Sequence, residues 1–391
     1  MTGLNQFHVL VLPSWYPTPE APLNGIFFKE QALALRKAGS KVGVVYPEFR
    51  SLRTFSLEGI LKNRFQVRFF EEEGIPTYRF CGWNLPRLRV GPRLWVCLVL
   101  RLFERYVRKF GMPDLVHAHS VLWGGVAAMQ ICRQHGTPYV ITEHSSHYAR
   151  GLIQDWQEPH IRNSLMQASA ILAVGSGLMN HLSQYAPEKK ITLVPNMVDT
   201  DFFTLPRWPR SESPFRLLTV ALLTPNKGID LLIRAFAEVL KVHPDAYLEI
   251  GGDGPQRGEL ESLAVTLGVA DKVCFLGMLS REGVRDAMWR ANAFVLPSYV
   301  ETFGVVLIEA LATGLPVIAT RSGGPEDFIS PMVGLLINPG NINELRQGLC
   351  YLLAKRGFFA EKVMRQYVTN RYGEKAIAET LLGLYKGIGK E

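Results

Sequence analysis

Two carboxylates eight residues apart, Glu301 and Glu309, are the first residues of this chain whose types and spacing point to chemistry. Glu309 is the only charged residue of the apolar segment 305–312. A buried carboxylate without a partner is costly. One interpretation places Glu309 at the wet edge of a core helix. The other places it in a cleft, where its oxygens accept hydrogen bonds from the hydroxyls of a ligand.

A lysine precedes another predicted helix, in the segment 224–228. A lone lysine in this position is usually solvated. Here Lys227 lies at the positive end of a helix dipole, which favours anions, and its ammonium adds attraction for phosphate. Phe303, Gly304 and Val305 begin a second helix, whose first N–H groups lack partners within the helix. Together these features predict a diphosphate site.

Polar side chains also follow strands in the first half. His117 and His119 straddle one strand end, and we expect alternation to send them to opposite faces, which excludes a metal pair. His117 is then a core histidine, and His119 is the functional candidate. His144 follows the next strand, in the polar segment 142–147. Gly25 ends a proline-rich loop, where it either lets the backbone approach a ligand or serves only the turn.

The elements that must position these residues alternate between short apolar runs and helical patterns, as in a doubly wound parallel sheet. The predicted strands are residues 7–12, 41–46, 115–118, 139–142, 170–174 and 191–194, then 216–221, 247–250, 273–276, 293–296 and 317–320. Between residues 46 and 93 we expect an irregular basic stretch. A helix over residues 93–110 follows it.

The segment 205–214 holds three prolines without periodicity and predicts a linker. We therefore expect a Rossmann-like N-terminal domain over residues 1–204 and a Rossmann-like C-terminal domain over residues 215–372. This α/β fold would leave a cleft between the carboxyl ends of the two sheets, where ligands are expected. The glycines of 251–254 do not keep the spacing of a dinucleotide fingerprint.

Composition is that of a soluble globular protein of 391 residues. The apolar run 7–12 is too short for a signal peptide, and no run is long enough to span a bilayer. Five scattered cysteines indicate reduced thiols rather than a disulfide frame or a zinc site. The net charge of +8 lies mostly between Arg50 and Lys109, which indicates an anionic partner: lipid, nucleic acid or a phosphorylated substrate.

The motifs closely resemble those of glycosyltransferase family 4, retaining enzymes of the GT-B fold, and the resemblance covers nearly the whole chain. It rests on Pro297-Ser298, Glu301-x-Phe303-Gly304 with Glu309, Gly323-Gly324-Pro325-Glu326, Lys227-Gly228, Gly252-Asp253-Gly254-Pro255, Val194-Pro195-Asn196-x-Val198-Asp199 and His117-x-His119. The resemblance implies two facing Rossmann-like domains, the first on the acceptor side and the second binding a nucleotide sugar. It also implies that a last helix, residues 373–391, packs back on the first domain.

The resemblance implies a role for each matching residue. Glu309 would hold the ribose hydroxyls of the donor, and Glu301 would contact hydroxyls of the transferred sugar. Lys227 would neutralise the departing diphosphate. The remaining donor contacts would come from Thr302, Phe303, Gly304 and Val305 around the distal phosphate or sugar, from His144 in preference to His119 near the reaction centre, and from Gly25 in the loop that closes over the diphosphate.

The implied activity is transfer of a hexosyl or N-acetylhexosaminyl group, with retention and without metal or cofactor. The donor would be a nucleotide-diphosphate sugar, UDP in preference to GDP, and the acceptor a sugar or a lipid-linked sugar in glycan, glycolipid or cell-surface polysaccharide synthesis. Nucleic acid is not an expected partner. The alternatives are a non-catalytic nucleotide-sugar-binding protein and a GT-B sugar-nucleotide epimerase.

Two residues depart from the family pattern. Most members have Gly-Arg-Leu where this chain has Leu222 in the middle position, so the second phosphate cation is missing. Such a cation stabilises the departing charge, and either Arg321 or Arg281 replaces it or turnover is slow. Met197 stands where glycine is usual, which concerns the geometry of the hinge before the linker.

A basic helix is relevant to where in the cell the protein acts. The apolar run 94–103 is flanked by Arg87, Arg89, Arg93, Arg101, Arg105, Arg108 and Lys109. One interpretation is a solvated helix face. The other is docking on an anionic membrane surface, which would suit a lipid-linked acceptor. We expect a cytoplasmic protein, at most peripheral at the inner face of the membrane.

Overall fold

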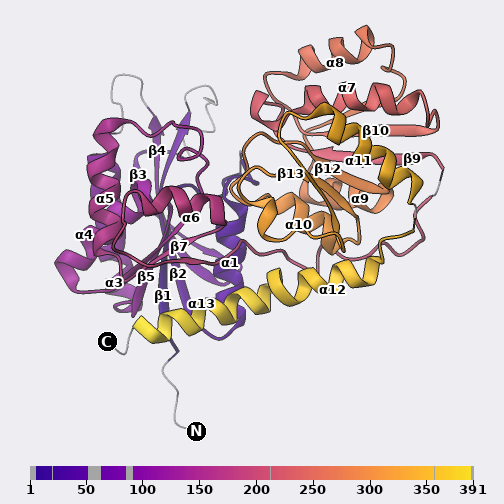
Figure 1. Cartoon of the computed structure of the whole chain (residues 1–391). Helices are drawn as coiled ribbons and strands as arrows, with labels where there is room; N and C mark the ends of the chain where they lie inside the picture. Colours follow the sequence, from indigo (N-terminus) through magenta and orange to yellow (C-terminus); the bar gives the residue numbers. More distant parts are fainter. Residues whose placement is uncertain are drawn as a thin grey trace. The chain divides into compact units, whose positions relative to one another are not determined.

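The computed structural model of the chain describes residues 6–19, 21–51, 63–84, 91–211, 213–355 and 357–388 (Figure 1). The chain divides into two compact units. Unit 1 comprises Met1–Val174, Leu178–Val194 and Ile377–Glu391, and unit 2 comprises Gly175–Gly177 and Pro195–Ala376. Each unit is an α/β structure around its own sheet.

Unit 1 contains an eight-stranded sheet that is parallel except at one edge. Across the sheet the strands are β3 (Gln66–Glu72), β4 (Ile75–Asn84), β2 (Lys41–Ser51), β1 (His8–Pro13), β5 (Leu115–His119), β6 (Tyr139–Glu143), β7 (Ala170–Ala173) and β8 (Ile191–Leu193). Strands covered on both faces are apolar almost throughout. This is why the central strands were visible in the sequence.

The helices of unit 1 form around this sheet. They are α1 (Ile26–Lys37), α3 (Pro92–Phe110), η2 (Val121–Gly125), α4 (Val126–His135), η3 (Asp155–Gln157), α5 (Glu158–Gln167), most of α6 (Ser176–Ser183) and most of α13 (Glu374–Ile388). α3 packs on β2 and β4. Its apolar run is largely buried there, including Val99, Leu102 and Phe103.

The prediction of an irregular stretch between residues 46 and 93 was wrong for the described residues. β2 continues to Ser51, and β3 and β4 form an antiparallel hairpin beside it. The error has a physical cause. One face of this hairpin carries charged side chains such as Arg68 and Arg79, so its strands lack the apolar runs that marked the others.

Unit 2 contains a six-stranded, wholly parallel sheet. Its order is β11 (Val273–Gly277), β10 (Ala246–Gly251), β9 (Phe215–Val220), β12 (Ala293–Leu296), β13 (Val317–Thr320) and β14 (Gly334–Ile337). Its helices are η4 (Pro225–Lys227), α7 (Ile229–Leu240), α8 (Arg257–Thr266), α9 (Arg281–Arg290), α10 (Val305–Ala312), η5 (Pro325–Asp327), α11 (Ile342–Ala354) and α12 (Glu361–Tyr372). The helix α12 was not predicted.

Candidate active site

The candidate site residues of unit 2 lie on loops that follow β9, β12 and β13. The Lys227 ammonium forms an ion pair with the Glu301 carboxylate. The Ser298 hydroxyl donates to the same Glu301 oxygen, Oε1, at 2.8 Å. The two charged side chains are 21% and 11% exposed, so solvent reaches the pair. A charged ligand can therefore compete for Lys227 without first opening the core.

Backbone contacts hold these loops in place. The Tyr299 amide donates to the Asn226 carbonyl at 2.8 Å, and the Glu301 amide donates to Ser322 at 3.0 Å. Gly228 has φ of 64°, and a Cβ there would lie 2.4 Å from the Pro297 carbonyl oxygen. Only glycine combines this conformation with this approach at low cost. The Lys227-Gly228 motif thus lets η4 pack closely against the loop after β12.

The start of α10 is built from the predicted donor-site residues. Gly304 is left-handed, with φ of 89°, and α10 begins at Val305, two residues after the predicted start. Phe303 is buried against Phe328, with ring centroids 5.0 Å apart, whereas Thr302 is half-buried. Glu309 lies in the same helix and is also half-buried. Glu309 is therefore neither a core residue nor a fully solvated one.

The missing arginine has no evident replacement at its own position. The Leu222 side chain is 59% exposed. The Arg281 guanidinium instead lies 4.4 Å from the centre of the Phe202 ring and donates to Asp199 at 3.4 Å. Arg321 is exposed and near Glu344, whose pKa is lowered by hydrogen bonds from Asn338 and further by the Arg321 charge.

Three histidines of unit 1 meet at the ends of β5 and β6. His117 and His119 lie with their rings 4.3 Å apart, and His119 Nδ1 is 3.1 Å from His144 Nε2. The expectation that alternation separates His117 from His119 was wrong. Residues two apart in a strand point to the same face. His147, in the same segment as His144, is exposed.

Burial keeps two of these histidines, His117 and His119, neutral. Burial lowers the pKa of His117 to about 3. It lowers the pKa of His119 well below the usual value, and the charges of His117 and His144 lower it further. His117 hydrogen-bonds Thr142 at 2.7 Å and the Tyr385 hydroxyl at 2.6 Å. In the contact between His119 Nδ1 and His144 Nε2, one nitrogen donates and the other accepts.

A residue that the sequence analysis missed fixes the turn that carries His144. The Glu143 carboxylate is buried and accepts hydrogen bonds from the amides of Val121, His144 and Ser145, each at 2.8 Å. It also accepts from the Tyr148 hydroxyl at 3.3 Å. The available signal was an acid at a strand end with two serines shortly after it, a pattern that favours local side-chain to backbone bonds.

Gly25 precedes α1 with φ of 70°. A Cβ there would lie 2.8 Å from the Trp15 carbonyl oxygen. The next turn brings Phe28 onto the histidines, with its ring centroid 4.6 Å from that of His119. Within unit 1 the structure therefore brings together the start of α1, His119 and His144. Lys227, Glu301 and the start of α10 come together in unit 2.

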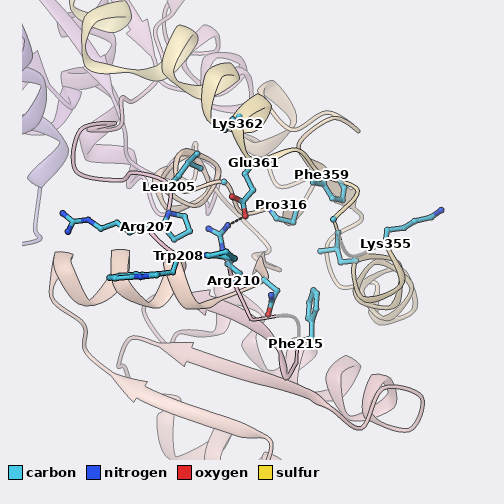
Figure 2. A pocket seen from close by; sticks show the side chains of 16 residues that line it. Leu205, Arg207, Trp208, Arg210, Phe215, Pro316, Lys355, Phe359, Glu361 and Lys362 are labelled. Atoms are coloured by element: carbon cyan, nitrogen blue, oxygen red, sulfur yellow. Dashed lines mark hydrogen bonds and ion pairs between the residues drawn. The ribbon is translucent and has the colours of Figure 1, made fainter.

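A cavity of about 610 Å³ lies elsewhere in unit 2 (Figure 2). It is lined by the predicted linker and by residues at the starts of strands, such as Phe215, the first residue of β9, and Pro316, just before β13. Arg210 forms an ion pair with Glu361 there, while Lys355 points away from that pair. None of the predicted site residues lines this cavity.

The basic helix presents its charges outward. Arg93, Arg101 and Arg105 are exposed on α3, but most of the apolar run between them is buried within unit 1 and is not available to a bilayer. Arg87 and Arg89 lie outside the described residues. Among the described helices, none is both long and apolar enough to cross a membrane. The described residues also contain no cluster of three or more histidines, cysteines or acids with the geometry of a metal site.

Two family models match consecutive parts of the chain. The model for Glycosyltransferase Family 4 matches residues 25–202, and that for Glycosyl transferases group 1 matches residues 203–371. The chain belongs to this family of glycosyltransferases, and its fold class is GT-B.

Among its relatives is an uncharacterized glycosyltransferase of Methanocaldococcus jannaschii, MJ1607, which is 29% identical over 84% of this chain and 91% of its own. The putative teichuronic acid biosynthesis glycosyltransferase TuaC of Bacillus subtilis is 27% identical over 87% of this chain and 88% of its own. One subunit of the human phosphatidylinositol N-acetylglucosaminyltransferase is 28% identical over 63% of this chain and 51% of its own.

Solved structures share the fold. Sucrose-phosphate synthase of Thermosynechococcus elongatus superposes with a TM-score of 0.77 at 23% identity, over 97% of this chain and 99% of that one. Anabaena HepE, solved with UDP, superposes with a TM-score of 0.72 at 19% identity, over 97% of this chain and 100% of that one.

Proposed function

We propose that this glycosyltransferase moves a hexosyl or N-acetylhexosaminyl group from a UDP sugar to an acceptor hydroxyl with retention of configuration. The observation that carries the proposal is the part-exposed ion pair between Lys227 and Glu301 beside the start of α10. Lys227 can exchange its carboxylate partner for a diphosphate. Glu301 is then released to accept hydrogen bonds from the hydroxyls of the transferred sugar.

The mechanism follows from the charges available. The departing diphosphate is neutralised by Lys227 and by the positive end of α10, as expected of a site that stabilises developing charge. An oxygen of that diphosphate takes the proton of the acceptor hydroxyl. The acceptor oxygen attacks the anomeric carbon of the sugar on the same face from which the diphosphate departs. The His144 imidazole, hydrogen-bonded to His119, can orient a hydroxyl of the donor sugar. No metal is required by these steps.

The acceptor is proposed to be a lipid-linked or polysaccharide sugar. TuaC and the human phosphatidylinositol N-acetylglucosaminyltransferase support this class through their names, and the structure of HepE with UDP supports a UDP sugar. The basic face of α3 would add attraction to an anionic membrane surface.

The test is turnover of a panel of UDP and GDP sugars, with the anomeric configuration of the product read by NMR. Retention is expected, with Glu301→Gln inactive. A protein that binds UDP but neither transfers nor hydrolyses any donor would favour the non-catalytic alternative, which the exposed Leu222 makes worth testing.

A further inference from the structure

A cavity of about 500 Å³ in unit 1 has six charged residues in its lining, beside prolines and other uncharged residues. It lies beside the carboxyl-terminal part of β2, which extends past the end of β1, and beneath the loop that follows β1. We call it the guanidinium pocket. Its principal lining residues are Glu48, Arg50, Arg68, Phe70, Glu72 and Arg79.

Strand alternation assembles the guanidinium pocket. Arg68, Phe70 and Glu72 occupy alternate positions of β3, and Glu48 and Arg50 occupy alternate positions of β2. Residues two apart share one face of a sheet. An ordinary sheet face packed against a loop would carry apolar residues, whereas this face carries ionised ones.

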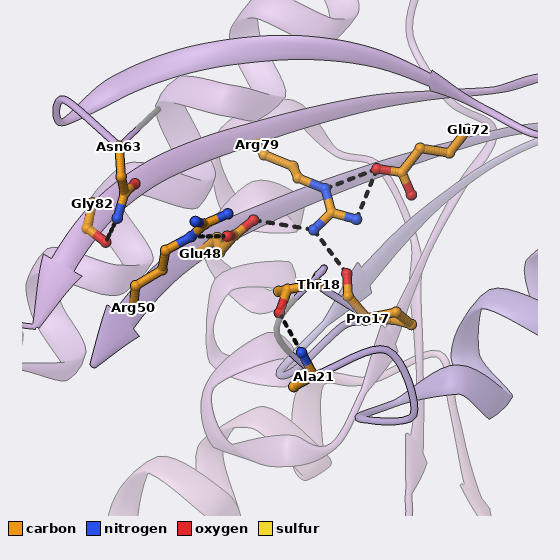
Figure 3. A network of polar contacts seen from close by, with 9 residues as sticks. All are labelled: Pro17, Thr18, Ala21, Glu48, Arg50, Asn63, Glu72, Arg79 and Gly82. Carbon is orange, nitrogen blue, oxygen red and sulfur yellow. Dashed lines mark hydrogen bonds and ion pairs between the residues drawn. The ribbon is translucent and has the colours of Figure 1, made fainter. Parts of the chain in front are cut away.

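Arg79 is the centre of the polar network (Figure 3). Its side chain is 7% exposed and donates to Glu72 at 2.8 Å, to Glu48 at 3.1 Å and to the Pro17 carbonyl at 2.9 Å. Arg50 donates to the other oxygen of Glu48 at 2.9 Å. Buried ion networks contribute little net stability, because desolvation offsets their attraction. Stability alone is therefore a weak reason for this network.

The arrangement of the arginines is itself unfavourable. Arg68 and Arg79 are directly opposite each other in the β3–β4 ladder, a position in which like charges are destabilising. Both guanidinium carbons also lie near the Phe70 ring, at 5.1 and 5.8 Å from its centroid. Among the described residues, the lining has four cations, including Lys29, and two carboxylates, and Lys29 also pairs with Glu73 at 2.8 Å.

We propose that the guanidinium pocket binds the acceptor through a phosphate ester, an inference that rests on the proposed transfer to an acceptor. A phosphate accepts several charge-assisted hydrogen bonds and matches the fork of an arginine. Its charge offsets the repulsion between Arg68 and Arg79. The ester belongs either to a lipid headgroup or to a free sugar phosphate.

The test uses the full chain saturated with UDP, so that the donor site is filled. Glucose 1-phosphate, with glucose as the uncharged control, is titrated by calorimetry into wild type, Arg68→Ala and Arg105→Ala. Arg68 is exposed at the pocket, and Arg105 is an exposed cation of α3 outside it. We expect the phosphate to bind at least tenfold more tightly than glucose, and Arg68→Ala but not Arg105→Ala to remove most of that preference. Arg68→Lys should restore part of it.

Equal affinities for glucose 1-phosphate and glucose, or an Arg68→Ala protein that keeps the preference, would overturn the proposal. UDP binding and donor hydrolysis on the same samples separate this failure from failure of the proposed function. Vesicles of phosphatidylinositol in phosphatidylcholine identify the source. Loss of vesicle binding in Arg68→Ala supports a lipid headgroup in the guanidinium pocket. Loss of vesicle binding in Arg105→Ala alone contradicts a headgroup in that pocket.

Discussion

In unit 2 the candidate donor residues form an ion pair that solvent reaches, Lys227 with Glu301, whereas in unit 1 the imidazoles of His117 and His119 are buried and neutral. A part-exposed ion pair can exchange one partner for a charged ligand without opening the core, because solvent already reaches the pair. Buried imidazoles that resist protonation add no positive charge, so they act on a ligand through hydrogen bonds alone. We infer that unit 2 neutralises the charge of the donor and that the histidines of unit 1 hydrogen-bond hydroxyls.

Acid should separate the two units most strongly. Between pH 6.5 and about 3 the unfolded chain protonates His117 while the folded chain does not. The free energy of unfolding therefore decreases as the pH is lowered through that window, by about 1.4 kcal/mol per pH unit for this histidine, and is unaffected above it. The protection of backbone amides against hydrogen exchange, relative to their intrinsic exchange rates, should decrease first in β5 and β6 at pH 5. Earlier loss of protection in β9 and β12 would contradict this prediction. The variant His117→Gln removes the titrating group, and His147→Gln, at an exposed histidine, is its control.

Removing either charge of the unit 2 pair should abolish most transfer. Lys227→Ala leaves the departing diphosphate without its cation, and we expect the rate at saturating donor to fall by about 10² to 10³, the usual effect of deleting one charge-stabilising group. Lys241→Ala, which removes an exposed lysine paired with Glu238, is the matched control. A Lys227→Ala enzyme within tenfold of wild type would place the donor elsewhere.

Gly25→Ala should be more damaging than the same change at Gly39. Both glycines have positive φ, at 70° and 93°, so each alanine costs about 1 to 2 kcal/mol of backbone strain. Only Gly25 adds a clash, with the Trp15 carbonyl, whereas nothing lies within 4 Å of a Cβ at residue 39. Urea unfolding compares the two variants. A larger KM for the donor in Gly25→Ala alone would show that this loop also approaches the ligand.

Leu222→Arg should raise the rate modestly, by a few fold. The position is 59% exposed, so an arginine fits without disturbing the core, and it supplies the cation that the family pattern implies there. Leu222→Gln is the uncharged control for the change in shape. No gain in the arginine variant would mean that the diphosphate lies away from residue 222.

Contiguous signals made unit 2 the easier part to predict from sequence. Glu301, Gly304 and Glu309 lie within one loop and the helix that follows it. Glycines with positive φ at 228, 304 and 314 mark turns of unit 2. The predicted helix start at residue 303 was two residues early, because Gly304 still lies in the left-handed region. Local chemistry was sufficient here.

Unit 1 depended on information that no short segment contains. The meeting of His117 with Tyr385 joins residues 268 positions apart. The guanidinium pocket requires the register of three strands, two of which were hidden by charged residues on one face. The assignment of His117 and His119 to opposite faces was an error in applying strand periodicity and not a lack of signal.

The most direct test of the division between the units is calorimetric titration of UDP into wild type, Lys227→Ala and Arg68→Ala full-length protein. We expect Lys227→Ala to weaken UDP binding at least tenfold and Arg68→Ala to leave the Kd for UDP within about twofold of wild type. UDP affinity that survives Lys227→Ala but falls in Arg68→Ala would contradict it.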